Sequence, residues 1–256
     1  MTAHIGTSGW QYRDWRGRLY PDRLPQGRWL EHYGAAFSTV EVNNAFYRLP
    51  EKSVFEGWRS RTPDDFCMAV KASRFLTHIK RLRDPEEPVS RLLERVAGVG
   101  GKLGPILLQL PPTLQADAAL LDRCLRCFPA EVRVAVEPRH VSWQADEVRS
   151  LLELHGAALC WADRGGRTVT PLWKTADWGY LRLHEGRASP WPWYGRQALR
   201  TWARRIADTW PDSADNFVYF NNDPGGAAVG NAATFAAEVA RLGRSAARLS
   251  VAPQHR

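Results

Sequence analysis

Eight short apolar runs, rich in β-branched and aromatic residues, recur along the 256-residue chain. Several are apolar almost throughout rather than alternating, which is typical of strands buried on both faces of a parallel sheet. Each run ends at polar or charged residues, so the pattern predicts buried strands that carry polar groups at their carboxyl ends. The predicted strands span residues 4–7, 38–42, 66–70, 105–110, 133–136, 157–162, 178–183 and 216–220.

Amphipathic helical stripes separate most of these runs, as Leu92, Val96 and Val99 illustrate. The weakest helix candidate is the link at 163–177, which contains glycines and a proline. Strands alternating with helices predict an α/β fold, a (β/α)8 TIM barrel with eight parallel strands and a reduced helix between strands six and seven. A doubly wound open sheet is the alternative. We expect a single domain over 1–245 and a flexible C-terminal tail over 246–256.

The composition is that of an ordinary globular protein, with 44% hydrophobic and 24% charged residues. No apolar run approaches the ~20 residues of a membrane helix, and the first ten residues show no secretory signal. We therefore expect a cytoplasmic protein without a membrane partner. The net charge of +8 favours a polyanionic partner, but the arginines that supply most of it are scattered. The lone C-x-x-C pair, Cys124 and Cys127, fits one helix face better than a zinc site.

The polar residues at the strand ends are the candidates for function. In a barrel of this class the loops at the carboxyl ends of the strands build the active site, so these side chains are expected to converge in one cleft. Strand by strand they are Trp10 and Tyr12; Glu41, Asn43 and Tyr47; Lys71 and His78; Gln109; Glu137, Arg139 and His140; Asp163; Arg182 and His184; and Asn221, Asn222 and Asp223.

Four of these residues are predicted to be catalytic. Glu137 is the candidate base or nucleophile, and His184 or His140 is its proton partner because histidine titrates near neutrality. Lys71 ends an apolar strand, where burial can remove its proton and make it a base or a Schiff-base amine.

The other strand-end residues are assigned to substrate binding, with Arg139 and Arg182 holding negative charge and Asn221 and Asn222 orienting the substrate. Asn231 joins them, because a glycine-rich segment opens a helix there and its first N–H groups suit an anion. Structural explanations stay open: paired charges for Glu41 and Lys71, satisfied hydrogen bonds for His78 and His184, and a plain turn for the glycines.

Seven motifs, in order along nearly the whole chain, resemble the domain of unknown function 72 family, also called YecE-like. They are GTSGWQYRDWRG (6–17), TVEVNNAFYRLP (39–50), VKASRFLTH (70–78), LGPILLQLPP (103–112), VEPRHVSW (136–143), YLRLHEG (180–186) and YFNNDPGGAAVGNA (219–232). The resemblance implies a TIM-barrel fold and no established activity. A distant likeness of that fold to endonuclease IV and sugar-isomerase barrels is an analogy only.

Two positions depart from the commoner form of the family. Pro138 stands where an aromatic residue is usual, and Glu185 separates His184 from Gly186 where the family runs His-Gly. These departures affect the expected shapes of the loops after strands five and seven.

The leading functional hypothesis is an enzyme, a hydrolase, lyase or isomerase, that acts on a small anionic substrate, phosphorylated or sugar-like, in this cleft. The alternatives are a nucleic-acid-binding or phosphodiester-processing protein and a non-catalytic metabolite-binding protein. No cofactor is expected, with a single Mg²⁺ or Mn²⁺ on Glu137 and Asp163 as the open alternative. Arginine and lysine dilute the ligands that a trinuclear zinc centre needs. The sequence leaves the oligomeric state undetermined.

Overall fold

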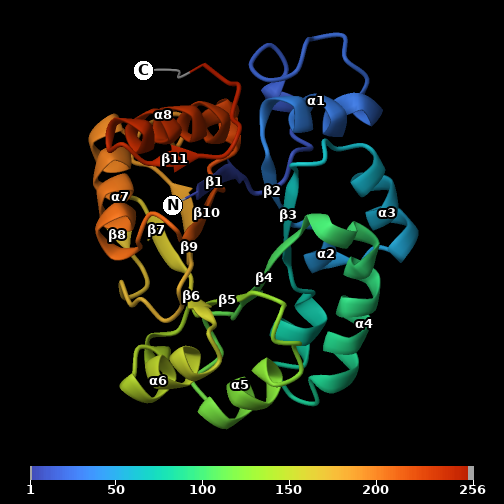
Figure 1. The fold of residues 1–256 in the computed structure, drawn as a ribbon, viewed down its shortest axis with the longest axis vertical. Coiled ribbons are helices and arrows are strands. Elements are labelled where there is room, and N and C mark those ends of the chain that lie inside the picture. Colours follow the sequence, from blue (N-terminus) through green and yellow to red (C-terminus); the bar gives the residue numbers. More distant parts are fainter. Residues whose placement is uncertain (1, 253–256) are drawn as a thin grey trace.

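The structure, a computed structural model, describes residues 2–252 and places their strands in two sheets (Figure 1). The first sheet has the order β11-β1-β10-β9-β7-β8 and contains β1 (Thr2–Thr7), β7 (Trp161–Arg164), β8 (Arg167–Thr168), β9 (Gly179–Glu185), β10 (Asp215–Phe220) and β11 (Ser245–Ala246). The second has the order β2-β3-β4-β5-β6 and contains β2 (Thr39–Val42), β3 (Cys67–Lys71), β4 (Leu103–Gln109), β5 (Val134–Glu137) and β6 (Ala158–Leu159).

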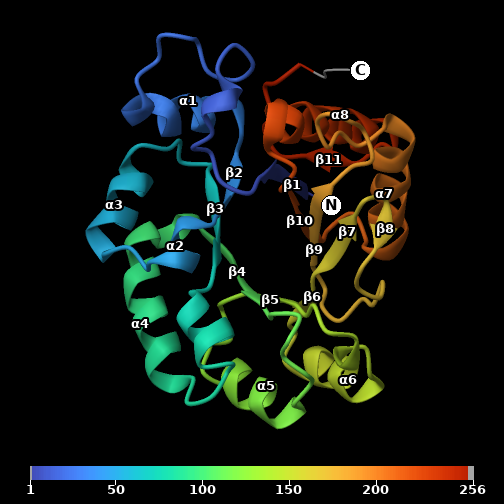
Figure 2. The same ribbon diagram turned by 180° about the vertical axis from the view of Figure 1, so that it is seen from behind.

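The helices surround the sheets, as the two opposite views show (Figures 1 and 2). They are α1 (Trp29–Ala36), α2 (Asn44–Tyr47), α3 (Lys52–Ser60), α4 (Glu86–Val96), α5 (Ala118–Leu125), α6 (Asp146–Leu154), α7 (Arg196–Thr209) and α8 (Ala227–Arg241). Local signals explain their ends: the Asp117 carboxylate accepts a hydrogen bond from the Leu120 amide at the start of α5 (3.0 Å), and Gly156 has φ +58° after α6. Within residues 2–252, no helix combines the length and the apolar composition needed to cross a bilayer.

The predicted closed (β/α)8 TIM barrel is wrong, because the strands divide into two separate sheets. Within residues 2–252, the only strand pairing between the sheets is an isolated bridge between Ser8 and Glu41. Tyr33 explains this junction: its hydroxyl accepts a hydrogen bond from the Thr7 amide (3.1 Å) and donates one to the Thr39 carbonyl (2.9 Å). A side chain therefore stands where a ladder bond between β1 and β2 would be.

The second junction lies in the sixth predicted strand, which divides into β6 and β7. β6 pairs with β5, whereas β7 pairs with β8 and β9. The Thr175 hydroxyl accepts a hydrogen bond from the Leu159 amide (2.7 Å), and the Thr170 hydroxyl accepts one from the Ala162 amide (2.9 Å). At this point the backbone amides of the strands therefore bond to threonine side chains instead of to a neighbouring strand. These threonines come from the link at 163–177, whose described backbone forms β8 and contains no helix.

Two apolar clusters hold the sheets in place. The larger one joins strands to helices and includes Val70 and Val136. The smaller one, here called the inner cluster, lies between the two sheets and includes Ala69, Ala135 and Tyr219. Neighbouring residues of one strand thus belong to different clusters. This alternation is expected of a strand that is buried on both faces, because successive side chains point to opposite sides of the sheet.

The C-terminal segment lies against the first sheet and α1. Ala246 pairs with Ala3, and Arg248 donates to both carboxylate oxygens of Asp65 (2.9 Å each). Of the predicted tail, residues 253–256 lie outside the described residues. The division into one domain and a flexible tail stays a prediction.

The junction between β1 and β2 leaves no room for a side chain at Gly6, because a Cβ there would overlap the Thr39 carbonyl oxygen. We expect Gly6→Ala to lower the free energy of unfolding by about 1–3 kcal/mol through overpacking. Gly57→Ala is the matched control: a Cβ at this position in α3 meets nothing within 4 Å, and alanine favours a helix by about 0.5–1 kcal/mol. Urea denaturation should show opposite signs, and equal effects would contradict this account of the junction.

Candidate functional site

Charged and polar side chains form a layer next to the inner cluster, at the carboxyl ends of parallel strands from both sheets. Side chains two residues apart on a strand point the same way, and four members of the layer follow a member of the inner cluster at this spacing. In this way Lys71 follows Ala69, Gln109 follows Leu107, Glu137 follows Ala135, and Arg182 follows Tyr180. The strands therefore carry these residues into one region, as predicted, without closing into a barrel.

Arg182 is the centre of the layer and is 1% exposed. Its Nη1 donates to Glu137 Oε2 (2.6 Å), and its Nη2 donates to Glu41 Oε1 (2.8 Å). Burial by itself lowers the pKa of Arg182, but the two carboxylates outweigh burial and raise the pKa above its ordinary value. A charged guanidinium from β9 thus joins β2 and β5, which belong to the other sheet.

The Glu41 carboxylate accepts hydrogen bonds from three protein donors. Besides Arg182, the Ser8 hydroxyl donates to its Oε1 (2.6 Å) and the Tyr180 hydroxyl donates to its Oε2 (2.6 Å). Glu41 is also completely buried. This geometry fits a paired structural carboxylate better than a substrate ligand.

Glu137 receives four donors within the layer. Gln109 Nε2 (2.7 Å) and Arg182 bind Oε2, while His184 Nε2 (2.8 Å) and Arg139 Nη2 (3.2 Å) bind Oε1. Burial by itself raises the pKa of Glu137, but the charge of Arg182, the hydrogen bond from His184 and the charge of Arg139 outweigh burial and hold the pKa well below its ordinary value. Glu137 therefore stays ionised near neutrality, where it is a poor base and a good acceptor that orients its neighbours.

His184 lies between Glu137 and Asn221. Burial lowers the pKa of His184 although the Glu137 carboxylate acts in the opposite direction, so the ring is neutral at pH 7. A carboxylate can only accept, so Nε2 carries the ring proton and donates it to Glu137. Nδ1 is then the acceptor, and the Asn221 amide donates to it (3.1 Å). The network therefore defines the tautomer that a general base needs.

Lys71 differs from the other charged members because it has no ion pair or hydrogen bond with any residue in 2–252. Its Nζ lies 3.8 Å from the centroid of the Phe46 ring. Burial, and next the charge of Arg182, lower the pKa of Lys71 from 10.5 to about 8. A fraction of this amine is therefore neutral at physiological pH.

A cavity of about 240 Å³ opens beside Glu137. Arg139, which is 29% exposed, and Arg164 line it together with His184. The apolar part of its wall consists of Pro112, Pro138 and Val169. Glu137 is the one acid in this wall, and it is already paired with arginine, so the electrostatic surroundings favour an anion.

Four predicted site residues are engaged elsewhere in the protein. His140 Nδ1 accepts the Ser142 amide (3.2 Å) and caps a short 3-10 helix, so the described contacts do not join it to Glu137. The Asp163 carboxylate accepts Trp202 Nε1 (3.2 Å) and the Gly166 amide (3.1 Å). The other two are Asn222 and Asn231.

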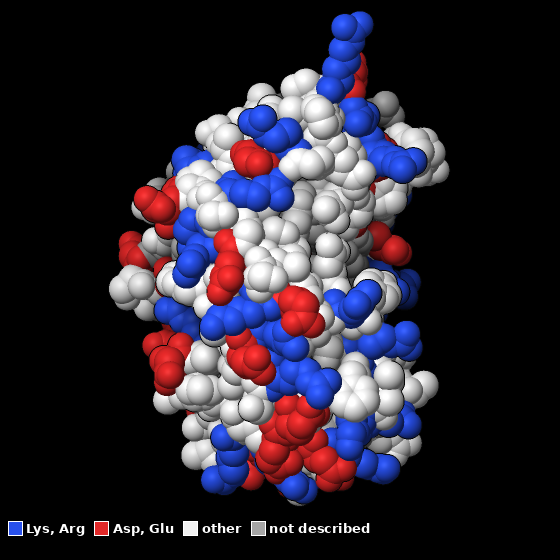
Figure 3. Space-filling view, turned by 90° about the vertical axis from the view of Figure 1, so that its right-hand side faces the viewer, with Lys and Arg blue, Asp and Glu red and all other residues white. Residues whose placement is uncertain are grey.

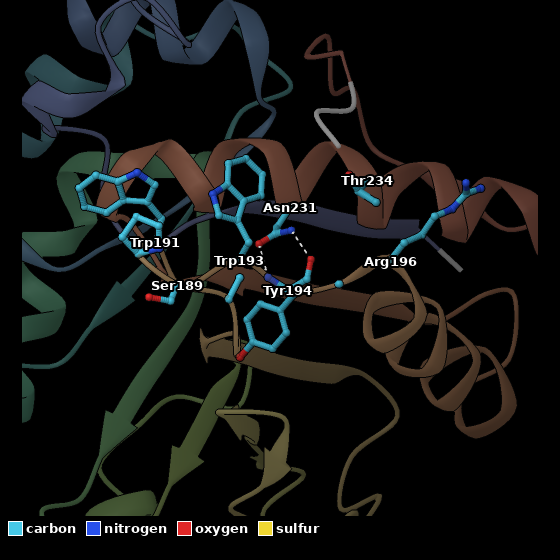
Figure 4. A pocket seen from close by; sticks show the side chains of 10 residues that line it. Ser189, Trp191, Trp193, Tyr194, Arg196, Asn231 and Thr234 are labelled. Carbon is cyan, nitrogen blue, oxygen red and sulfur yellow. Dashed lines mark hydrogen bonds between the residues drawn. The ribbon is translucent and has the colours of Figure 1, made fainter. Parts of the chain in front are cut away.

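Asn222 and Asn231 hold the loop that precedes α7, and Figure 4 shows Asn231 beside Tyr194 of this loop. Asn231 Oδ1 accepts the Tyr194 amide (2.9 Å) and Asn222 Nδ2 (2.8 Å), and its own amide donates to the Tyr194 carbonyl (3.0 Å). Trp191 and Trp193 line a second cavity of about 220 Å³ in this loop. The glycine-rich segment at 221–235 therefore fixes the loop through its asparagines.

The remaining predicted binding residues surround the layer at varying depth. Trp10 is buried against Trp58, whereas Tyr47 is 76% exposed. His78 Nδ1 binds the Thr77 hydroxyl (2.8 Å). The described contacts therefore do not bring these three residues into the Glu137 network.

Asn43 and Asp223 each keep a buried side-chain oxygen without a hydrogen-bond partner in residues 2–252. Burial raises the pKa of Asp223 to about 7, although the nearby Tyr12 hydroxyl acts in the opposite direction. The Tyr12 hydroxyl also donates to the Ser8 carbonyl (2.5 Å). This edge of the layer therefore carries a carboxyl group that titrates near neutrality.

Sequence reasoning missed Tyr180, which donates to Glu41, and Arg164, which lines the cavity. The period of two would have found Tyr180, since it precedes Arg182 by two residues in the same strand. Arg164 had no such signal, because its place depends on the turn between β7 and β8.

The described residues contain no group of three or more His, Cys, Asp and Glu side chains suited to a metal ion. The Glu137 oxygens face two guanidinium groups, and the Asp163 carboxylate faces Trp202. Cationic neighbours oppose the binding of a further cation. The residues present therefore do not fit a Mg²⁺ or Mn²⁺ ion on Glu137 and Asp163.

The geometry defines an α/β protein with a buried ionic layer between two sheets and an arginine-lined cavity beside it. Residues 4–255 match the sequence model of the family described as "Protein of unknown function DUF72", so the chain belongs to that family. The resemblance drawn from the sequence motifs is confirmed. The family description assigns no activity or substrate.

Curated relatives and solved structures agree with this assignment. YecE of Escherichia coli K12, a UPF0759 protein, is 34% identical over 112 residues, and the match spans 43% of this chain and 41% of that relative's length. YunF of Bacillus subtilis, also UPF0759, is 24% identical over 89% of this chain and 91% of its own. A DUF72 family structure from Thermotoga maritima has a TM-score of 0.82 at 27% identity, covering 94% of this chain and 100% of the other. One from Enterococcus faecalis, with a TM-score of 0.78 at 19% identity over 93% and 96% of the chains, shows the fold alone.

Replacing Arg182 should expose the dependence of the layer on its central charge. Arg182→Met leaves Glu41 and Glu137 as buried carboxylates without their shared cation, and we expect a loss of about 3–5 kcal/mol in the free energy of unfolding. The pKa of Glu137 would rise in the variant, so its deficit should be largest at neutral pH and shrink as acid protonates this carboxylate. Arg61→Met, which removes a surface pair with Glu31, should cost about 0–1 kcal/mol. Urea denaturation from pH 4 to 8 measures both, and similar losses would refute the central role of Arg182.

Replacing Lys71 should have the opposite effect on stability. A lysine whose pKa falls on folding opposes folding while both states are protonated, and that penalty disappears between pH 8 and 10.5 as the unfolded chain loses its proton. We expect Lys71→Met, which keeps the contact with Phe46, to raise the free energy of unfolding by about 1–3 kcal/mol at pH 7 and by less at pH 10. Lys80→Met, at an exposed pair with Asp84, should change it by less than about 0.5 kcal/mol. A Lys71→Met protein less stable than the parent at pH 7 would contradict the assignment.

Proposed function

We propose that this protein is an enzyme that acts on a small anionic substrate, phosphorylated or sugar-like, in the cavity beside Glu137. One observation carries the proposal: Arg139 and Arg164 line the same cavity as the neutral His184. Guanidinium groups bind phosphate and carboxylate through paired hydrogen bonds. The position of the histidine next to them places a proton acceptor beside the site where an anion would bind.

The network suggests a division of roles. Glu137, held ionised by Arg182 and Arg139, orients His184 and keeps its proton on Nε2. Nδ1 is the basic atom of the ring. The Asn221 amide donates to it, and a substrate O–H or N–H would donate to Nδ1 in place of that amide. His184 is therefore the proton carrier in our proposal, and Glu137 is its positioning residue rather than the base.

The dimensions of the site favour a small substrate. A volume of about 240 Å³ lies below the roughly 300–1,000 Å³ of pockets that hold drug-sized ligands. A compact metabolite with one charged group and several hydroxyls is the appropriate class. A non-catalytic protein that binds the same metabolite would use the same arginines, and turnover distinguishes the two.

The charge distribution gives less support to a nucleic-acid partner. On the face shown in Figure 3, arginine and lysine alternate with aspartate and glutamate, and no unbroken basic track crosses it. Many arginines also pair with acids, as Arg196 and Arg200 do with Glu238. Because phosphate-backbone binding depends on unpaired cations, this hypothesis ranks below the small anion.

The proposal predicts anion binding that depends on the cavity arginines. Titration calorimetry with inorganic phosphate and sugar phosphates should show that Arg139→Ala and Arg164→Ala each weaken binding roughly 10- to 100-fold, about 1.4–2.8 kcal/mol. Arg126→Ala, at an exposed pair with Asp122, is the matched control and should bind normally.

Turnover of any substrate found in this way should fall in His184→Ala and in Glu137→Gln, the latter with a changed pH profile because the histidine loses its orienting charge. Undiminished turnover in both variants would remove the catalytic roles. Equal binding by the arginine variants and the control would remove the anion site itself.

A further inference from the structure

Lys71 is unlike the other lysines of this chain, Lys52, Lys80, Lys102 and Lys174. Lys80 pairs with Asp84, and Lys102 donates to the carbonyls of Arg59 and Thr62. Lys52 and Lys174 lie exposed on the surface. Lys71 is part-buried, and within residues 2–252 it has neither an anionic partner nor an acceptor.

Its surroundings explain why no partner holds it. Lys71 projects from the end of β3 into the layer that contains Glu41, Glu137, Arg139 and Arg182. Both carboxylates are already bound by arginine, so neither reaches the amine. The Phe46 ring covers one side of Nζ at 3.8 Å and fixes its position.

A cation left without a counter-ion in such a layer costs stability, and a fold that needed only packing would carry an apolar residue here. Burial, and next the charge of Arg182, disfavour the protonated form of Lys71, so a fraction of the amine has a free nitrogen lone pair at neutral pH. Proteins that use a lysine amine as a nucleophile place it away from water or next to another cation, because both conditions favour the neutral amine.

We propose that Lys71 is a nucleophilic amine that forms an imine with a carbonyl compound, so that the substrate of this site is an aldehyde or ketone carrying an anionic group. The inference deepens the function proposed above and rests on it for the anionic group, which Arg139 and Arg164 would hold. The amine itself is a separate feature of β3 and can be tested separately.

The proposed step is balanced. The Lys71 Nζ lone pair attacks the carbonyl carbon, a C–N bond forms, and the proton released from nitrogen passes to the carbonyl oxygen. A proton taken from solvent converts the hydroxyl group of this carbinolamine to water, and the departure of that water leaves the protonated imine. The protonated imine then withdraws electrons from the neighbouring carbon, from which a base can remove a proton. Neutral His184, with its basic Nδ1, is the base that the layer offers.

Chemical trapping tests the proposal on the intact chain. The protein is incubated at pH 7.5 with sodium cyanoborohydride, which delivers hydride to an imine carbon, and with either dihydroxyacetone phosphate or dihydroxyacetone. Intact-mass analysis and peptide mapping then locate the reduced adduct. We expect one adduct per chain, on Lys71, formed about tenfold faster with the phosphorylated ketone and slowed by inorganic phosphate.

Two lysine variants control the experiment. Lys71→Arg keeps the charge and Lys71→Met keeps the packing, and both should lose the adduct while circular dichroism shows them folded. Lys80→Arg should label as the parent does. Label spread evenly over the lysines, or retained in the Lys71 variants, would overturn the proposal.

The outcomes separate this inference from the function on which it rests. If phosphate binds through the cavity arginines and Lys71 forms no adduct, the amine proposal falls alone. If Lys71 reacts equally fast with both ketones and phosphate does not compete, the amine assignment stands and the anion site falls.

Discussion

The double ion pair of Arg182 is the interaction on which the rest of this structure depends. Two buried carboxylates, from β2 and β5, point into this layer, and a single guanidinium from the other sheet binds both. Because the sheets share only an isolated bridge in the described residues, side-chain contacts set their separation. Arginine suits this role because its guanidinium group is planar. Its N–H donors point in fixed directions, so they determine the positions of both carboxylates.

The same pairing decides what the site can bind. Arg182 and Arg139 together balance the two buried carboxylates, and Arg164 and Lys71 add positive charge at the edge of the layer. Lys71 is partly buried, whereas Arg139 and Arg164 reach solvent, and charges of the same sign held near one another repel. An anion relieves that repulsion on binding, so the preference for negative charge comes from the arrangement of the whole layer rather than from any one residue.

The period of the apolar runs was sufficient to predict most of the strands, though not β8 or β11, and the convergence of Glu137, Arg182 and His184. His140 shows the limit of that reasoning: it follows Glu137 by three residues, beyond the end of β5, where the strand period no longer determines its direction. The barrel prediction failed at contacts distant in sequence, such as the Tyr33 hydroxyl between two strands. A pattern of residue types predicts which residues are buried. It does not predict which side chain accepts a hydrogen bond from a backbone amide and so replaces a bond between two strands.

The order of strands in the first sheet constrains how the chain can fold during synthesis. β1 leaves the ribosome before the other strands described, yet it lies between β10 and β11, whose residues follow about 200 positions later. At roughly 5–20 residues per second the first strand waits on the order of 10–40 s for its neighbours. Its hydrogen-bonding edges stay open during that interval, so a nascent chain of this protein exposes an unpaired strand to chaperones or to other chains. The second sheet, whose strands are consecutive in sequence, has no comparable delay.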